Sequence, residues 1–286
     1  MGANFEIQNG FVVGSVKSQL IGNKIKLPFP SVGATENILM ASVLAKGETK
    51  ISNAAREPEI EDLSNCLIKM GAKIEGHGTK TILVQGVTNL KKAEHEIISD
   101  RIVAGTYIIA ALMLNSALEI NNFNTIYLKS LIDILKKMGA KLKVSKNSIK
   151  VFKGSKLKSS SLSTSPYPGF PTDLQAQLMS LMCISDGKSK IKETIFENRF
   201  MHVPELNRLG ANITVEKDTA TIIGNQTFKG AQVMASDLRA SISLVLAAMN
   251  ANGQTTLNRV YHLDRGYENI EKTLGSLGAK IKRQKN

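Results

Sequence analysis

Aspartate and arginine residues recur at the starts of three predicted apolar helices. They stand in the segments Asp100-Arg101, Thr172-Asp173 and Asp237-Leu238-Arg239. Each carboxylate could cap its helix by accepting a hydrogen bond from a free backbone N–H of the first turn. If the three helix starts met at one cleft, their N–H groups and the guanidinium groups of Arg101 and Arg239 would instead form a strong anion site. The residues leave both interpretations open.

Asp173 is the first candidate for acid–base chemistry. It follows a loop at 153–172 that is rich in Ser, Lys and Pro, and ordered loops of this kind often carry function. Gln175 and Gln177 are polar positions in an otherwise apolar helix start. Capping would lower the pKa of Asp173 and make it a weak base. A role as general base therefore depends on its hydrogen-bond reach to the proton.

Three further arginines occupy matching places between a predicted strand and the helix after it. They lie in Ala55–Pro58, Phe196–His202 and Tyr261–Glu268. Each segment could be a loop closed by a salt bridge. Alternatively, Arg56, Arg199 and Arg265 could face a common anionic ligand, since the guanidinium fork matches phosphate and carboxylate oxygens.

The histidines and cysteines predict no metal site. The four histidines are dispersed, and we interpret His202 and His262 as packed loop residues. Cys66 and Cys183 fall among apolar helix positions without an activating base, so we expect two inert core thiols. Two cysteines make neither a disulfide framework nor a metal-ligand cluster. This usage fits a reducing, cytoplasmic location.

An internal repeat indicates which elements position these residues. The pattern Leu-x-x-Met/Leu-Gly-Ala places glycines at positions 71, 139, 210 and 278, and a partial copy places one at position 2. A self-similarity this regular predicts a fold of repeated units. In each copy the Gly follows an apolar helical pattern and precedes a strand-like segment, so it predicts a helix end.

Each full unit reads helix–strand–helix–strand–strand, which is βαβαββ in circular order. The first helix of a unit is apolar all round and should be buried, whereas the second is amphipathic. We therefore expect buried helices in the centre and sheets outside, the inverse of the usual barrel. The predicted helices are 32–44, 58–70, 101–114, 126–138, 173–184, 201–209, 238–250 and 266–277. The predicted strands are 4–7, 11–16, 49–52, 72–74, 81–85, 117–121, 140–144, 148–152, 188–193, 212–215, 219–223, 255–258 and 279–282.

The net charge of +13 is uneven along the chain. Residues 1–98 hold 11 Lys and Arg against 10 Asp and Glu, whereas 99–286 hold 26 against 14. Such a surplus could attract nucleic acid, a membrane surface or anionic small molecules. The lysines are scattered, however, and no apolar run reaches the ~20 residues of a membrane span. We expect a solvated, lysine-rich surface and neither nucleic acid nor membrane as a partner.

Five stretches resemble the UDP-N-acetylglucosamine enolpyruvyl transferases, or 1-carboxyvinyltransferases, of the EPSP-synthase-like superfamily. They are Asn53–Ile60, Phe170–Gln177, Phe196–Glu205, Ser236–Ala240 and Tyr261–Glu268, in the order of the family. The resemblance implies an α/β fold, the inside-out α/β barrel of βαβαββ units in two domains. On that layout, residues 1–98 form a partial first domain and 99–286 a nearly complete second domain of three repeats.

The resemblance also implies a reaction. Enolpyruvate passes from phosphoenolpyruvate to the 3'-hydroxyl of UDP-N-acetylglucosamine, and phosphate is released. Addition and then elimination pass through a tetrahedral ketal, without a metal or an organic cofactor. In the family this is the first committed step of peptidoglycan synthesis, and thus of cell-wall biogenesis.

The matched motifs imply roles for individual residues. Asp173 would take the proton of the sugar hydroxyl, and Arg239 and Arg265 would hold the carboxylate and phosphate of phosphoenolpyruvate. Arg199 would support the site, and Ile195 would touch the sugar nucleotide. Asp173 would also be a substrate contact. In the first domain, Ser31, Val32 and Gly33 would meet the UDP diphosphate at a helix N-terminus.

Two departures from the family accompany the resemblance. Phe29-Pro30, just before the diphosphate contact, lacks the Lys of the family. The chain also starts at the partial repeat Met1-Gly2-Ala3. We therefore expect the family's N-terminal half, with its Lys-Asn pair and its loop bearing a Cys and an Arg, as a missing partner. The alternatives are a non-catalytic fragment that keeps the fold and weak anion binding, or EPSP synthase on the shared fold. The Asn53–Ile60 and Phe196–Glu205 motifs argue against EPSP synthase.

Overall fold

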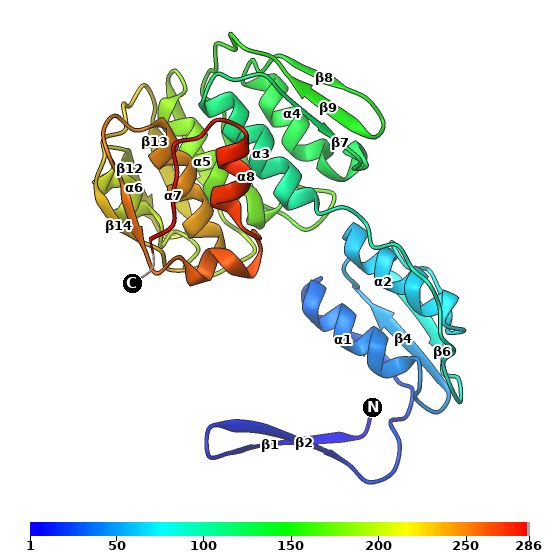
Figure 1. Cartoon of the computed structure of the whole chain (residues 1–286). Coiled ribbons are helices and arrows are strands. Elements are labelled where there is room, and N and C mark those ends of the chain that lie inside the picture. Colours follow the sequence, from blue (N-terminus) through cyan, green and yellow to red (C-terminus); the bar gives the residue numbers. More distant parts are fainter. Residues whose placement is uncertain (285–286) are drawn as a thin grey trace. The chain divides into compact units, whose positions relative to one another are not determined.

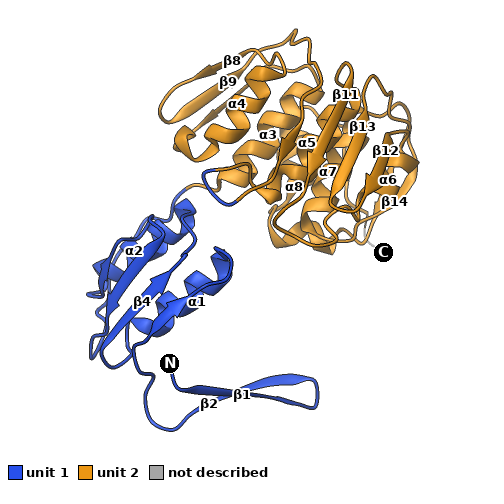
Figure 2. Cartoon of the chain, turned by 180° about the vertical axis from the view of Figure 1, so that it is seen from behind, with its two compact units in different colours: residues 1–98, 166–168 blue, residues 99–165, 169–286 orange. Residues whose placement is uncertain are grey.

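The computed structural model describes residues 1–284, which form two compact units (Figure 2). Unit 1 comprises Met1–Ile98 together with Pro166–Pro168. Unit 2 comprises Ser99–Ser165 and the chain from Gly169 onwards. Each unit has its own hydrophobic core.

Unit 1 holds one helix pair packed on a four-stranded sheet. The helices are α1 (Val32–Ser42) and α2 (Pro58–Lys69), and the sheet order is β3-β4-β6-β5. Leu39, Ile60 and Ile82 are fully buried between the helices and the sheet. The unit begins with an antiparallel hairpin of β1 and β2. The strands of unit 1 are β1 (Ala3–Gln8), β2 (Phe11–Val16), β3 (Lys24–Lys26), β4 (Glu48–Ser52), β5 (Lys73–Glu75) and β6 (Thr81–Gln85).

Unit 2 places three apolar helices at its centre (Figure 1). These are α3 (Arg101–Met113), α5 (Gln175–Ile184) and α7 (Leu238–Asn250), which contact one another. Because nearly every side chain of α5 is buried, polar positions such as Gln175 and Gln177 lie in the core as well. The outer helices are α4 (Lys129–Lys137), α6 (Val203–Arg208) and α8 (Ile270–Ser276). Helices inside and sheets outside confirm the inside-out α/β arrangement.

Three sheets, none of them closed, cover the helices of unit 2. Their orders are β7-β9-β8, β10-β11-β13-β12 and β14-β15. In the second sheet β10 runs parallel to β11, whereas β11, β13 and β12 are antiparallel neighbours. The strands are β7 (Leu118–Asn121), β8 (Leu142–Val144), β9 (Ser148–Val151), β10 (Leu162–Ser163), β11 (Lys188–Lys192), β12 (Asn212–Glu216), β13 (Thr219–Ile223), β14 (Gln232–Met234) and β15 (Thr256–Asn258).

The repeated Gly-Ala motif ends four helices in the same way. Gly71, Gly139, Gly210 and Gly278 have φ values of +101°, +97°, +101° and +97°, in the left-handed region that favours glycine. In each copy the N–H of the following Ala donates to the carbonyl of the Leu five residues before it, over 2.9–3.0 Å. This is the bond of a Schellman helix end, so the predicted role of the glycines is confirmed.

Some predicted boundaries were wrong. The predicted strand at 279–282 is not formed, and the helix predicted at 266–277 starts only at Ile270, after a 3-10 turn at Val260–Arg265. The strands β3, β10 and β14 were not predicted. They have only two or three residues, too few for an alternating pattern, and each pairs in parallel with a later strand.

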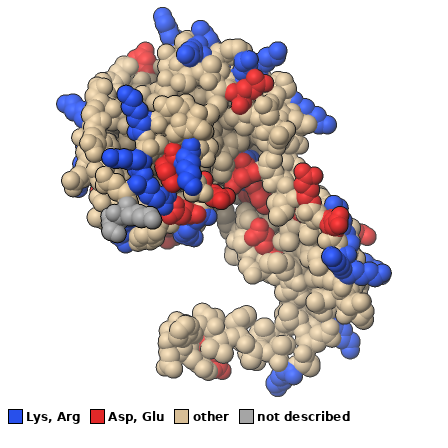
Figure 3. Space-filling view, in the orientation of Figure 1, with Lys and Arg blue, Asp and Glu red and all other residues tan. Residues whose placement is uncertain are grey.

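No helix among the described residues is long and apolar enough to pass through a bilayer. Lys and Arg side chains are spread over the visible face and do not gather into one stripe (Figure 3).

Two glycines that follow the inner strands of equivalent repeats allow a test of the packing. A Cβ atom at Gly224 would lie 1.8 Å from the carbonyl oxygen of Ser185, and one at Gly86 would lie 1.7 Å from that of Ala45. Backbone must move to relieve such a clash. We expect Gly224→Ala to lower the free energy of unfolding by about 1–3 kcal/mol, measured by urea denaturation.

The matched control is Gly275→Ala, because Gly275 lies in α8 with no atom within 4 Å of an added Cβ. This change should raise the free energy of unfolding by about 0.4–1 kcal/mol. Equal unfolding midpoints for the two variants would contradict the close approach at Gly224.

Candidate active site

Asp173 lies between two arginines that come from distant parts of the chain. It belongs to a 3-10 turn, Thr172–Leu174, that leads into α5. Arg199 Nη2 donates to Asp173 Oδ1 over 2.8 Å, and Arg239 Nη2 donates to Oδ2 over 2.7 Å. The Asp173 side chain is still 38% exposed, so its oxygens remain accessible to a ligand.

Asp100 and Asp237 are helix caps, as one interpretation predicted. Asp100 Oδ1 accepts the N–H groups of Ile102 and Val103 at the start of α3. Asp237 Oδ1 likewise accepts those of Arg239 and Ala240 at the start of α7. Asp173, by contrast, does not cap a helix, so the capping interpretation was wrong for this residue. The 3-10 turn precedes α5, and the Asp173 carboxylate binds guanidinium groups instead.

Opposing effects set the charge state of Asp173. Burial by itself would raise the pKa of this carboxyl, but the charge and hydrogen bond of Arg239 and the charges of Arg199 and Arg101 lower it below the ordinary value. The pairing therefore stabilises the folded chain at pH values above the ordinary pKa of Asp. That stabilisation is lost as the pH falls through the lowered pKa of the folded state. At neutral pH Asp173 is a carboxylate.

A buried polar network lies next to this ion pair. The Gln177 amide donates to the backbone carbonyl of Asp173 over 2.9 Å and to Thr106 Oγ1 over 3.2 Å. Thr106 Oγ1 also bonds the hydroxyl of Tyr267 at 2.8 Å. Burial raises the pKa of Tyr267, so its hydroxyl stays protonated. These bonds join α3 and α5 to the segment that precedes α8.

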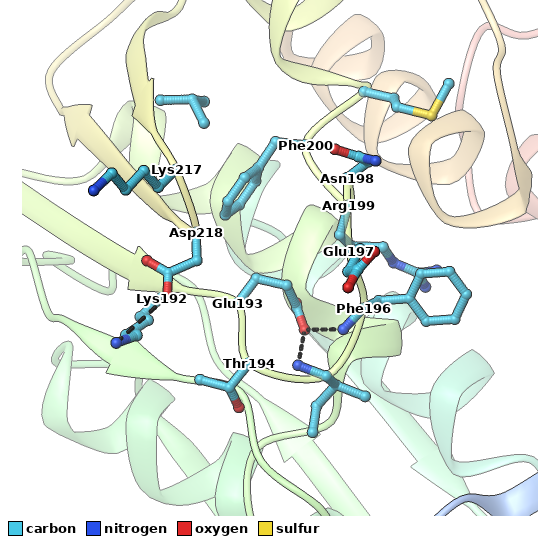
Figure 4. Close-up of a pocket in the computed structure, with 13 residues that line it drawn as sticks. Lys192, Glu193, Thr194, Phe196, Glu197, Asn198, Arg199, Phe200, Lys217 and Asp218 are labelled. Carbon is cyan, nitrogen blue, oxygen red and sulfur yellow. Dashed lines mark hydrogen bonds and ion pairs between the residues drawn. The ribbon is translucent and has the colours of Figure 1, made fainter.

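A hollow of about 950 Å³ opens beside Arg199 (Figure 4). It is lined by the loop after β11 and by the turn between β12 and β13. Ile195 and Phe196 lie on its rim, and the Arg199 guanidinium stacks over the Phe196 ring at 4.9 Å from its centroid. The buried Glu193 carboxylate accepts the backbone N–H groups of Ile195 and Phe196, at 2.9 and 3.1 Å.

The other predicted site residues are placed as follows. Arg265 is exposed and has no ion pair among residues 1–284, so the structure does not bring it into the Asp173 network. Arg56 donates to the carbonyl of Tyr167, within unit 1. Ser31 caps α1 by accepting the N–H of Ala34, and Val32 and Gly33 form its first turn. The idea that Arg56, Arg199 and Arg265 share one ligand therefore stays a prediction.

Several residues of the site were missed or only partly interpreted from the sequence. Glu193 gave no signal beyond its place at the end of a predicted strand, and Thr106 lay inside an apolar helix.

Cys183 is buried and its thiol pKa is raised by burial to about 12, which confirms an inert core cysteine. His202 is buried as predicted, and its burial lowers the pKa to about 4.

Comparison with known proteins decides the family. A family model described as EPSP synthase (3-phosphoshikimate 1-carboxyvinyltransferase) matches residues 1–274. The chain is 51% identical to a UDP-N-acetylglucosamine 1-carboxyvinyltransferase of Pelagibacter ubique, over 99% of this chain and 68% of the relative. It belongs to this family of enolpyruvyl transferases. A second carboxyvinyltransferase of the family, from Mesorhizobium japonicum, is 52% identical over the same shares.

Solved enolpyruvyl transferases have the same fold. NikO from Streptomyces tendae superposes with a TM-score of 0.90 at 26% identity, covering 98% of this chain and 69% of that one. EPSP synthase from Acinetobacter baumannii gives 0.74 at 20% identity and supports the fold alone. The chain spans about two thirds of the length of these carboxyvinyltransferases and enolpyruvyl transferases.

Substitution of Arg239 should change the titration of Asp173. In Arg239→Gln the carboxylate loses its main cationic partner, so its pKa should rise toward and beyond the ordinary value of Asp. The measurement is an NMR titration of the Asp173 side-chain carboxyl. The control is Arg208→Gln, which removes an exposed arginine whose ion pair within residues 1–284 is with Glu205, and it should leave the pKa of Asp173 unchanged. A pKa of Asp173 that stays low in Arg239→Gln would contradict the assigned cause.

Proposed function

We propose that this chain catalyses enolpyruvyl transfer from phosphoenolpyruvate to the 3'-hydroxyl of UDP-N-acetylglucosamine, in peptidoglycan synthesis. The observation that carries the proposal is the partly exposed Asp173 carboxylate, which forms ion pairs with Arg199 and Arg239. The kinship with carboxyvinyltransferases supports it, because the Pelagibacter and Mesorhizobium relatives are named for action on this sugar nucleotide. The scattered lysines favour small anionic substrates over nucleic acid.

Asp173 is the acceptor of the sugar hydroxyl proton in this proposal. The hydroxyl oxygen bonds to C2 of phosphoenolpyruvate while C3 gains a proton, which gives a tetrahedral ketal. The ketal then loses its phosphate from C2 and a proton from C3, so that the enol double bond is restored on the sugar. A carboxylate with a lowered pKa is a weak base, so its contribution depends on a fixed hydrogen bond to the hydroxyl.

The arginines around Asp173 stabilise negative charge in the substrates. Arg239 lies in the first turn of α7, where Asp237 already accepts the N–H groups of Arg239 and Ala240, so the guanidinium group is the part that meets an anion. The carboxylate of Asp173 raises the pKa of Arg239, against the effect of burial, so this side chain stays charged. We assign Arg239 and Arg265 to the carboxylate and phosphate of phosphoenolpyruvate, and Arg199 to the support of Asp173.

The sugar nucleotide is assigned to the loop of Ile195 and to the start of α1. Ile195 offers an apolar contact on the rim of the hollow beside Arg199. Ser31, Val32 and Gly33 form a capped helix start with open space around Gly33, which suits a diphosphate. Neither assignment calls for a metal or an organic cofactor.

We also propose a cytoplasmic location, because the two cysteines are free thiols.

The test is phosphate release from phosphoenolpyruvate. We expect release with UDP-N-acetylglucosamine and none with shikimate 3-phosphate, the substrate that would indicate EPSP synthase. The chain is assayed alone and after addition of the part of the Pelagibacter relative that it does not match. Binding of the sugar nucleotide is measured separately by calorimetry. Absence of both release and binding under either condition would refute the proposed function and favour a non-catalytic protein.

Asp173→Asn should lower kcat by a factor of about 10²–10⁴, the usual contribution of a positioned acid–base group. The affinity for UDP-N-acetylglucosamine in calorimetry should change little, because the amide can still accept a hydrogen bond. The matched control is Asp133→Asn, on the exposed face of α4 beside Lys129. Equal kcat values for the two variants would remove Asp173 from the reaction.

A further inference from the structure

Glu193 is a buried carboxylate whose partners are all neutral hydrogen-bond donors. It directly follows β11 and is 5% exposed. Its Oε1 accepts Thr164 Oγ1 at 2.8 Å and the N–H groups of Ile195 and Phe196, and its Oε2 accepts Thr172 Oγ1 at 3.0 Å. Three of these bonds fall on Oε1 and one on Oε2, so most of the acceptor capacity of the carboxylate is used within the protein.

The four bonds join both halves of the Asp173–Arg199 ion pair. Thr172 is the residue before Asp173 in the same 3-10 turn, so one bond restrains the carboxylate. Phe196 lies beneath the Arg199 guanidinium, so another bond restrains the platform on which that arginine stacks. The loop that bears Ile195 is fixed by the same oxygen.

A second set of bonds holds the donor Thr164 in place. Thr164 Oγ1 accepts the N–H of Thr194 at 2.8 Å, and Thr194 Oγ1 donates to the carbonyl of Thr164. Thr164 is itself fully buried. Glu193 therefore lies on a rigid support and is not a mobile side chain. Removing it would leave the buried Thr164 hydroxyl and three part-buried donors without this acceptor, which is costly.

We propose that Glu193 is a positioning residue, which fixes Asp173 against Arg199 and holds the Ile195–Phe196 rim in the form that receives the sugar nucleotide. The inference rests on the proposed function for its kinetic consequences. Its two structural consequences do not depend on turnover: the pKa of Asp173 and the protection of the Ile195 and Phe196 amides.

Two substitutions separate the two tasks of Glu193. Thr172→Val removes only the bond to the Asp173 turn and changes no charge. Glu193→Gln replaces one carboxylate oxygen with an NH₂ group that cannot accept, so the rim or the turn loses its acceptor. Thr49→Val is the control, because Thr49 is a buried threonine of β4 whose hydroxyl has no hydrogen-bond partner among the described residues.

For Thr172→Val we expect kcat to fall about 10- to 100-fold, the effect of a small misplacement of a reacting group. KM for UDP-N-acetylglucosamine should stay within about twofold, since the rim keeps its bonds to Glu193. The pKa of Asp173, followed by NMR, should rise because its hold on Arg199 loosens.

For Glu193→Gln we expect a higher KM as well, and faster hydrogen exchange of the Ile195 and Phe196 amides. Thr49→Val should match the parent in kcat, KM and Asp173 pKa.

A merely structural role would lower the thermal midpoint of both variants while kcat and the pKa of Asp173 stayed at parent values. That outcome would overturn the proposal. If Glu193→Gln does not fold, Thr172→Val decides alone through kcat and the pKa. If the parent chain shows no turnover, alone or with the added part of the Pelagibacter relative, Glu193 is judged by the pKa of Asp173 and by amide exchange. A rise in both would still support the positioning role, and no change in either would refute it.

Discussion

The ion pair of Asp173 with Arg199 and Arg239 is the interaction on which the site depends. Its three members come from distant parts of the chain, and the packing of α7 against α5 and α6 accompanies their meeting. A partly buried carboxylate is tolerated because cations compensate its lost hydration. The same burial strengthens the attraction between the carboxylate and the arginines, since fewer water molecules screen their charges. The site is thus inseparable from the core of unit 2.

The repeated unit explains why chemistry collects at one end of that core. In each repeat a central helix is followed by a strand and then by an outer helix that ends at a Gly. The central helices α3, α5 and α7 therefore hold equivalent places in their repeats. Two starts keep an ordinary cap, at Asp100 and Asp237. The third begins with a 3-10 turn, which frees Asp173 from the backbone. At one of three equivalent positions the carboxylate is therefore free of the backbone and pairs with side chains instead.

Much of this architecture could be predicted from the sequence. The Gly-Ala spacing and the contrast between apolar and amphipathic helices predict helices inside and sheets outside, because both report on burial. The capping of Asp100 and Asp237 follows from local geometry. Asp173 could not be interpreted in this way, because its partners lie 26 and 66 residues away. Glu193 could not be found either, since its four donors converge only in the folded chain.

Asp173 and Glu193 show how two carboxylates a short distance apart in sequence acquire opposite roles. Asp173 is 38% exposed and binds two cations, so its charge is stabilised while lone pairs remain available. Glu193 is 5% exposed and accepts four hydrogen bonds from neutral groups. A weak base accelerates proton transfer only where its position relative to the proton is fixed. Orientation then contributes to the rate what the low basicity does not. The rigidity of Glu193 therefore compensates for the low basicity of Asp173.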